Sequence, residues 1–340
     1  MATYAEIGIH LDDARRTTER LAEIAARGRG AGVLVDVGAF GGMYRLGDAG
    51  DYADPVLVAS TDGIGTKVKI AAALGRYDTL GIDIVNHCVN DIAVQGARPL
   101  FFLDYLALHR ADPEVVTAIV AGVADACAAA GCSLLGGETA EMPDVYPPGE
   151  LDLAGFVVGV MDRATIGANG PPAAGDVLLG LPSTGLHTNG YSLARRALPP
   201  ATWGEFDLAL NMTVGEALLA PHRSYLAEIQ TLIGVGARGF AHITGGGFPE
   251  NVARVLPPDL SAEIDTTTWA PPAIFGRIAR EGAVLPGEMY RVFNMGIGLV
   301  GIVPAERVGE AIRTVPEAVV IGEIVPRGAE TAVRLLGLAA

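Results

Sequence analysis

The chain repeats one local pattern on both sides of a central segment rich in glycine and proline. In each half, short apolar strands end at glycine-containing turns that open helices, as in residues 55–74 and 239–255. The central segment, residues 167–175, reads Gly-Ala-Asn-Gly-Pro-Pro-Ala-Ala-Gly and is typical of a linker. Alternating strands and helices indicate an α/β (α+β) architecture. We therefore predict two domains, residues 1–166 and 167–340.

Hydrophobic periodicity and capping residues predict the individual elements. Asp112 and Pro113 supply an N-cap and a first helical position for a helix over 113–130. The other predicted helices cover 10–27, 67–74, 80–94, 190–197 and 244–255. The predicted strands cover 55–60, 100–108, 133–135, 153–161, 176–181, 239–243, 297–303 and 318–324.

Charge and composition exclude several classes of protein. The net charge of −15 argues against a nucleic-acid-binding surface, which is normally basic. The longest apolar runs, 153–161 and 295–303, contain glycine and are far shorter than the roughly 20 residues of a membrane helix. Three cysteines without a C-x-x-C pair favour reduced thiols over a disulfide framework or a zinc site. We expect a soluble, cytoplasmic protein that binds neither nucleic acid nor membrane.

Both lysines of the chain lie in one window, Ser60-Thr-Asp-Gly-Ile-Gly-Thr-Lys-Val-Lys69. A compact ammonium beside a glycine turn is suited to a phosphate. The spacing is not that of a P-loop, and Asp62 suits phosphate only through a divalent cation, which points to a magnesium nucleotide. The alternatives are two neighbouring surface lysines and an aspartate that caps a helix.

A polar stripe runs along the otherwise apolar helix predicted over 80–94. Asp83, Asn86 and Asn90 share one face, and His87 and Asp91 are four residues apart. Because polar groups on an apolar helix are costly without partners, the stripe requires a cation, a ligand or another polar element. For His87 alone, a hydrogen-bonded core histidine is favoured over a catalytic one.

A third acidic group follows the short strand predicted over 133–135. Glu138 comes directly after two glycines and, with Asp62 and Asp91, would complete a three-carboxylate magnesium site. Because Mg²⁺ usually takes one or two protein carboxylates, three acids suit more than one ion. For Glu141 and Asp144, we favour a solvated acidic loop.

The second half carries two further polar turns at helix starts. Ser183–Ser192 includes His187 and Asn189, and Thr244 is followed by Gly245, Gly246 and Gly247. Glycines let a backbone approach a ligand closely. Two such turns suit a phosphorylated substrate bound apart from the nucleotide, whereas either turn alone is more typical of an ordinary helix cap.

These stretches together resemble the phosphoribosylformylglycinamidine cyclo-ligases, also called aminoimidazole ribonucleotide synthetases. The resemblance covers nearly the whole chain. It rests on Thr61-Asp-Gly-Ile-Gly-Thr-Lys67, Gly81-Ile-Asp83, Val89-Asn-Asp91, Gln95-Gly-Ala97, Phe101-Phe-Leu-Asp-Tyr105, Gly136-Gly-Glu-Thr-Ala-Glu-Met-Pro143, His187-Thr-Asn-Gly-Tyr-Ser192, His242-Ile-Thr-Gly-Gly-Gly247 and Met289-Tyr-Arg-Val-Phe-Asn294.

The resemblance implies a fold and a reaction. Two N-terminal domains would join their strands across a homodimer, and each C-terminal domain would be a mixed-sheet α/β domain. With ATP and Mg²⁺ as cofactors, formylglycinamidine ribonucleotide would be closed to aminoimidazole ribonucleotide, with ADP and phosphate as the other products. The amide oxygen would be phosphorylated first.

The resemblance also implies roles for the motif residues. Lys67 and His187 would be catalytic. Asp62, Asp91 and Glu138 would hold Mg²⁺. The nucleotide would contact Asp62, Gly63, Gly65, Thr66 and Lys67. The substrate would contact His187, Asn189, Gly245, Gly246 and Gly247.

Two sister enzymes and a binding protein are the competing interpretations. Selenophosphate synthetase needs a cysteine or selenocysteine in the N-terminal glycine loop, and no cysteine precedes Cys88. Thiamine-phosphate kinase is expected to lack the sequence motifs at residues 136–143 and 187–192. A non-catalytic nucleotide-binding subunit would leave the charged clusters unused.

Overall fold

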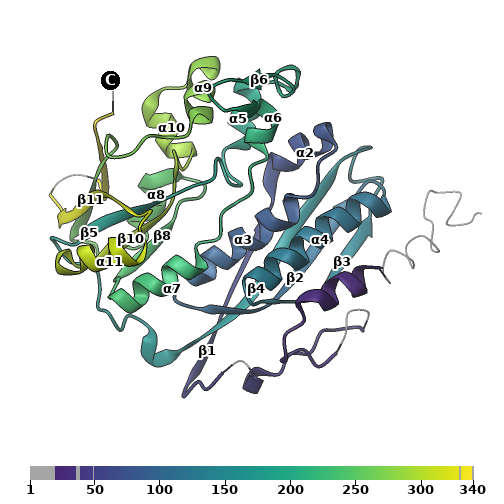
Figure 1. Cartoon of the computed structure of the whole chain (residues 1–340), viewed down its shortest axis with the longest axis horizontal. Helices are drawn as coiled ribbons and strands as arrows, with labels where there is room; N and C mark the ends of the chain where they lie inside the picture. The colour runs from purple at the N-terminus through teal and green to yellow at the C-terminus, as the bar shows by residue number, and fades with distance from the viewer. Residues whose placement is uncertain (1–19, 36–38, 49, 329–330, 339–340) are drawn as a thin grey trace, which may run out of the picture. The chain divides into compact units, whose positions relative to one another are not determined.

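The computed structural model describes residues 20–35, 39–48, 50–328 and 331–338 (Figure 1). They form two compact units. The first contains the described residues through Ile92 together with Ala97–Arg163, and the second contains Ala93–Gly96 and the described residues from Ala164 onward. The predicted helix over 10–27 lies mostly outside the described residues; residues 20–25 are helical, and a 3₁₀ turn over Ala26–Gly28 follows.

The first unit is built on a four-stranded sheet with the order β1-β4-β2-β3. Strand β4 pairs antiparallel with both β1 and β2, whereas β2 and β3 are parallel. A parallel pair requires a crossover, which a helix supplies here. The strands are β1 (Pro55–Gly63), β2 (Arg98–Leu108), β3 (Ser133–Glu141) and β4 (Leu151–Asp162).

Two long helices, α3 (Leu80–Ala93) and α4 (Pro113–Ala129), lie side by side on this sheet (Figure 1). They approach so closely at Gly81 that an added Cβ atom would lie 2.2 Å from the Ile119 carbonyl oxygen. Asp112 caps α4 by accepting a hydrogen bond of 2.9 Å from the Glu114 N–H. The cap sets the start of α4, and the close crossing holds α3, which carries the polar stripe, against α4.

The other face of the sheet is partly uncovered and apolar. Leu57 on β1 and Phe156 on β4 are 58% and 43% exposed. The register places Thr61 opposite Phe156, and Ala59 opposite Val158, and both β1 residues are exposed. Exposed apolar side chains on one sheet face are typical of an interaction surface.

The second unit is built on a six-stranded mixed sheet with the order β12-β9-β11-β5-β10-β8. Only the outer β12–β9 pair is parallel among these neighbours. The strands are β5 (Val177–Pro182), β8 (Gly239–His242), β9 (Leu260–Asp265), β10 (Ile297–Val303), β11 (Val319–Pro326) and β12 (Val333–Leu336). A separate two-stranded sheet joins β6 (Phe206–Asp207) to β7 (Met212–Thr213).

Helices complete the core of the second unit. Leu179, Leu299 and Val303 of the sheet pack with Leu232 of α7 and Ala311 of α11 in one buried cluster. Strand β10 is buried at every position, as expected of a central strand covered on both faces. The helices are α5 (Tyr191–Ala197), α6 (Val214–Leu218), α7 (Leu226–Val235), α8 (Gly247–Ala253), α9 (Ala273–Gly282), α10 (Pro286–Val292) and α11 (Val308–Thr314).

The two-domain α/β (α+β) class and most predicted elements are confirmed. The segment 65–74 is a 3₁₀ turn over Gly65–Lys67 followed by α2 (Val68–Leu74). One prediction is wrong: Glu141 lies in β3, and its carboxylate accepts a hydrogen bond of 2.8 Å from the Ala111 N–H. It is therefore not part of a solvated loop.

Candidate functional site

The acidic site of the first unit begins where β1 ends. Asp62 lies at the penultimate position of this strand, and its carboxylate, 41% exposed, accepts a hydrogen bond of 2.7 Å from the Gly63 N–H. Ile64 is fully buried and donates its N–H to the Leu153 carbonyl, which anchors the turn. Gly65 has a φ of 66°, a conformation that favours glycine.

Helix α3 brings a histidine and a second carboxylate to Asp62. His87 Nε2 lies 3.0 Å from Asp62 Oδ2 and 3.9 Å from Asp91 Oδ2, and the Ser60 hydroxyl donates to Asp91 Oδ2 at 3.2 Å. His87 is 3% exposed, so the expectation of a hydrogen-bonded buried histidine is confirmed. Asp62 and Asp91, distant in sequence, thus share one imidazole.

The electrostatics of this cluster follow from its geometry. Burial acts to lower the pKa of His87, but the hydrogen bond that its ring donates to Asp62 and the charges of Asp62, Asp91 and Asp83 raise it above its ordinary value. Burial likewise acts to raise the pKa of Asp62, yet the His87 contact and the Gly63 N–H hold it below its ordinary value. The cluster therefore favours an ionised carboxylate facing a protonated imidazole.

These two carboxylates fit a hard divalent cation. Both are partly exposed, at 41% and 28%, and both have an oxygen within 4 Å of His87 Nε2. Carboxylate oxygens are the ligands that Mg²⁺ prefers, usually one or two of them with phosphates and waters. Asp62 and Asp91 would hold the ion.

Lys67 pairs with a different carboxylate of α3. Its side chain is fully buried, and Nζ lies 2.7 Å from Asp83 Oδ2, which is equally buried. Burial lowers the pKa of Lys67, although the charge of Asp83 opposes the shift. The structure thus gives this ammonium a partner inside the core, and its contact with ATP phosphates stays a prediction.

The sheet register keeps Glu138 away from Asp62. Asp62 pairs with Gly155 of β4, Gly155 with Asp104 of β2, and Asp104 with Gly137 of β3. Three strand spacings of about 4.8 Å put β3 about 14 Å from β1. Side chains alternate along a strand, so Glu138 also faces the opposite side from Gly137. These carboxylates of one chain cannot share one ion, and the metal role of Glu138 stays a prediction.

Asp104 is a buried acid to which sequence reasoning gave no role. It is 7% exposed on β2, and burial raises its pKa to about 7, opposed by its own backbone N–H. An added Cβ atom at Gly137 would lie 2.2 Å from Asp104 Oδ1, so the glycine leaves room for the carboxyl. The sequence signal that could have identified Asp104 is an acidic residue within an otherwise apolar predicted strand.

The predicted substrate loop of the second unit is held by a dense hydrogen-bond network. His187 has a φ of 61°, rare for a residue other than glycine. The Tyr191 hydroxyl donates to the His187 carbonyl at 3.1 Å and to the Leu218 carbonyl at 2.6 Å. Asn294 Nδ2 donates to the Gly185 carbonyl at 2.8 Å. A strained residue held from several sides is typical of a functional site.

The structure brings the two predicted substrate turns together. An added Cβ atom at Gly245 would lie 3.4 Å from Asn189 Oδ1. Gly246 and Gly247 have φ values of 91° and 58°, and Asn251 Nδ2 donates to the Gly247 carbonyl at 2.8 Å. Side chains from residues 187–189 and backbone from residues 245–247 therefore line one region of this unit.

Two further histidines adjoin this region, and sequence reasoning assigned them no role. His222 precedes α7, and His242 ends β8. His187, His222 and His242 are 1%, 1% and 6% exposed, and each has a ring nitrogen within 4.8 Å of the others. Isolated histidines far apart in sequence give no periodic signal, which is why the pattern missed them.

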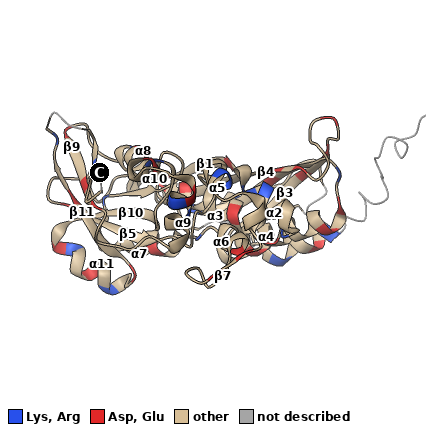
Figure 2. Ribbon diagram, turned by 90° about the horizontal axis from the view of Figure 1, so that it is seen from above, with Lys and Arg blue, Asp and Glu red and all other residues tan. Residues whose placement is uncertain are grey.

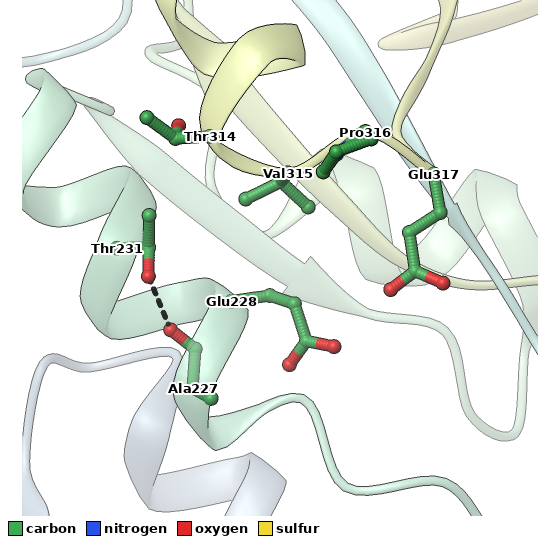
Figure 3. A pocket seen from close by; sticks show the side chains of 7 residues that line it. All are labelled: Ala227, Glu228, Thr231, Thr314, Val315, Pro316 and Glu317. Carbon is green, nitrogen blue, oxygen red and sulfur yellow. Dashed lines mark hydrogen bonds between the residues drawn. The ribbon is translucent and has the colours of Figure 1, made fainter.

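A hollow of about 450 Å³ lies elsewhere in the second unit, between α7 and the end of α11 (Figure 3). Glu228 and Glu317 line it, and Arg223 binds both carboxylates. The Thr231 hydroxyl donates to the Ala227 carbonyl at 2.8 Å. Because its acids are already paired, we assign it no role.

Charged side chains of both signs are interspersed along the described chain (Figure 2). Around α11, for example, Arg307 Nη1 lies 2.9 Å from Glu310 Oε2. Among the described residues, none of the helices combines the length and apolar character needed to cross a bilayer.

Comparison with known proteins identifies relatives along the whole chain. Residues 29–161 match the model for the N-terminal domain of AIR synthase related proteins, and residues 173–334 match the model for their C-terminal domain. A phosphoribosylformylglycinamidine cyclo-ligase of Sorangium cellulosum is 47% identical over 96% of both chains. One from an Anaeromyxobacter species is 48% identical over 88% of both.

Solved structures share the fold at much lower identity. Hydrogenase maturation protein HypE of E. coli superposes with a TM-score of 0.67 at 20% identity, covering 96% of this chain and 94% of its own. Thiamine-monophosphate kinase from Stenotrophomonas maltophilia gives a TM-score of 0.64 at 18% identity, covering 95% and 96%. At this identity the likeness concerns the fold alone.

Proposed function

The chain belongs to the AIR synthase related family, and from that premise we propose that it closes the imidazole ring of aminoimidazole ribonucleotide. The substrates are formylglycinamidine ribonucleotide and ATP, and the other products are ADP and phosphate. The observation that carries the proposal is the 47% identity to a named cyclo-ligase over 96% of both chains. The sister kinase named above is only 18% identical. The protein is therefore a ligase that forms a C–N bond in purine biosynthesis.

The chemistry explains the need for ATP. An amide oxygen is a poor leaving group, whereas phosphate is a good one. The γ-phosphoryl group passes to the formamide oxygen, the amidine-side nitrogen attacks the adjacent carbon, and phosphate departs as the ring closes with loss of one N–H proton. The protein positions the reactants and neutralises charge.

We assign the nucleotide to the first unit. Asp62 and Asp91 would hold Mg²⁺, which would neutralise charge on the ATP phosphates. The backbone at Gly63, Gly65 and Thr66 faces the phosphates. Lys67 Nζ lies 2.7 Å from Asp83 Oδ2 inside the core, and through this contact Lys67 positions the turn.

We assign the second substrate to the second unit. His187 and Asn189 contact formylglycinamidine ribonucleotide, and the backbone of Gly245, Gly246 and Gly247 approaches its phosphate. The support is that the two turns lie together, with 3.4 Å between the Cβ position of Gly245 and Asn189 Oδ1. We assign His187, which has a strained backbone conformation, a role in proton transfer.

The working form that we propose is a cytoplasmic homodimer. Leu57 and Phe156 leave an apolar patch on the uncovered sheet face, which a second copy would bury. Cys88, Cys127 and Cys132 are free and buried, as suits a reducing compartment. Sedimentation equilibrium should give twice the chain mass for the wild type and a lower mass for Phe156→Asp. A monomeric wild type would contradict the dimer.

Transfer of oxygen tests the proposed reaction directly. Substrate labelled with ¹⁸O in its formyl group is incubated with enzyme, ATP and Mg²⁺, and the released phosphate is examined by mass spectrometry. One labelled oxygen should appear in each phosphate. Product with unlabelled phosphate would rule out the phosphorylated amide, and an absence of aminoimidazole ribonucleotide would refute the ring closure.

A further inference from the structure

A continuous hydrogen-bond chain runs inward from the proposed substrate loop. Asn189 Nδ2 donates to Thr188 Oγ1 at 3.4 Å, Thr188 Oγ1 lies 3.3 Å from His222 Nδ1, and His222 Nε2 lies 3.0 Å from His242 Nε2. Thr188, His222 and His242 are all buried. Both ring nitrogens of His222 are thus engaged, one with the loop and one with the end of β8.

The part of this chain from Thr188 to His242 can transmit a proton because both of its hydrogen bonds can run in either direction. A hydroxyl both donates and accepts, and a neutral imidazole donates from one nitrogen and accepts at the other. If Thr188 donates to His222 Nδ1, then His222 Nε2–H donates to His242. In the other tautomer, His242 donates to His222, which donates to Thr188. Histidine is the side chain best suited to such exchange near neutral pH.

A metal site is the competing interpretation of three clustered histidines. The lone pair of an imidazole lies in the ring plane, so coordination requires the planes to converge on the ion at about 2.0–2.1 Å. The rings of His187 and His222 are instead stacked, with centroids 4.0 Å apart and planes only 19° from parallel. The lone pairs of two stacked rings run side by side and do not converge on one ion. The geometry therefore favours the hydrogen-bonded chain over a metal site.

We propose that His222 is a positioning residue that relays the proton released in ring closure from Thr188 to His242. The proposal rests on the proposed function. The attacking nitrogen of the substrate gives its proton to Thr188 Oγ1 as the Thr188 hydroxyl proton passes to His222 Nδ1. The His222 Nε2 proton passes at the same time to His242 Nε2. One proton leaves the substrate and His242 becomes an imidazolium, while Thr188 and His222 stay neutral.

The stack gives His222 a second effect on the same loop. Its ring covers His187, whose carbonyl is held by Tyr191. The relay residue therefore also keeps the loop of residues 187–189 in place. A test has to separate this packing role from proton transfer.

His222→Gln separates the two roles. A glutamine amide can accept from Thr188 and donate to His242, but it cannot pass a proton between them. We expect a kcat about 100-fold lower, in the range that general acid–base groups contribute, with KM for the ribonucleotide within about twofold and a melting temperature close to that of the wild type. The ascending limb of the pH–kcat profile should change in the variant.

Two further measurements complete the test. His222→Ala leaves an imidazole-sized cavity, so added imidazole should restore part of kcat. His109→Gln is the control: this histidine contacts the Tyr146 carbonyl at 2.7 Å in the first unit, and its loss should leave kcat and the pH profile unchanged. A His222→Gln enzyme with wild-type kcat and pH profile would overturn the proposal.

A spectroscopic readout keeps the proposal independent of turnover. With ¹⁵N-labelled histidine, the wild type should show one proton resonance coupled to Nε2 of both His222 and His242, absent in His222→Gln. Its absence from the wild type would refute the shared proton even if the enzyme made no product. Stoichiometric Zn²⁺ bound by the wild type and lost in His222→Gln would show a metal site and also overturn the relay.

Discussion

The polar clusters of the two units are built from different kinds of groups. The first unit relies on formal charges carried by regular elements, as in Asp62 on β1, His87 on α3 and the buried Lys67–Asp83 pair. The second relies on hydroxyl, imidazole and backbone groups on turns, such as Thr188 and His222. Buried charges are costly unless paired, so the paired groups need the fixed positions that strands and helices give. Groups that both donate and accept hydrogen bonds can find partners in more than one geometry, so they can lie on turns.

The largest effect is expected where a formal charge is most deeply buried. Lys67→Met leaves the Asp83 carboxylate in the core without its ammonium partner, which should cost about 3–5 kcal/mol in the free energy of unfolding. Asp83→Leu in the same chain should recover most of this loss. Urea unfolding of the two single variants and the double variant measures the coupling.

Lys69→Met is the matched control within the same window. Lys69 pairs with Glu150, but the two side chains are 38% and 29% exposed. Exposed pairs contribute about 0–1 kcal/mol, so this variant should remain close to wild-type stability. Equal losses in the free energy of unfolding for Lys67→Met and Lys69→Met would contradict the claim that the buried ion pair contributes more to stability than the exposed one.

The next effect concerns catalysis by the charged cluster. Asp91→Asn removes one of two carboxylates proposed to hold Mg²⁺, and kcat/KM should fall about 100-fold or more, as for the loss of a key charge-stabilising group. The Mg²⁺ concentration for half-maximal rate should rise. Asp144→Asn, in an exposed segment of the same unit, is the control. An unchanged Mg²⁺ requirement would exclude Asp91 as a ligand.

Per pH unit, the smallest effect is the pH dependence that Asp104 imposes on the stability of the first unit. Burial raises its pKa to about 7 from its ordinary value of 3.8. Between these values the folded chain keeps a proton that the unfolded chain has released, so stability should fall as pH rises, by about 1.4 kcal/mol per pH unit. Below pH 3.8 and above about 7 this contribution should be flat.

Asp104→Asn tests this assignment because an amide of the same shape does not titrate. Urea unfolding from pH 4 to 8 should show a weaker decline for the variant than for the wild type. Parallel curves for the two proteins would mean that Asp104 is ionised in the folded chain throughout this range.

The sequence predicted most of the fold because strand alternation, helix caps and glycine turns are local signals. It also indicated that the polar stripe on the helix over 80–94 would find partners, and His87 contacts Asp62, whereas the metal role of Asp62 and Asp91 stays a prediction. It could not give the partner of Lys67, which depends on how α2 and α3 pack. Nor could it give the register that separates Glu138 from Asp62, because strand order is set by long-range pairing.

The second unit shows the same limit more strongly. The segments around His187 and Gly245 could be recognised from the sequence as candidate binding turns, because glycines and small polar residues cluster there. His222 stands alone in sequence, and only the fold places it 3.0 Å from His242 Nε2. A single residue that acts only through tertiary contacts produces no recognisable pattern in the sequence.

The most direct test of the account measures ADP and aminoimidazole ribonucleotide in the same sample, with purified protein, ATP, Mg²⁺ and formylglycinamidine ribonucleotide. The account predicts one aminoimidazole ribonucleotide for each ADP, and no ADP above background when the ribonucleotide is omitted. ADP formed without the ring-closed product would contradict it.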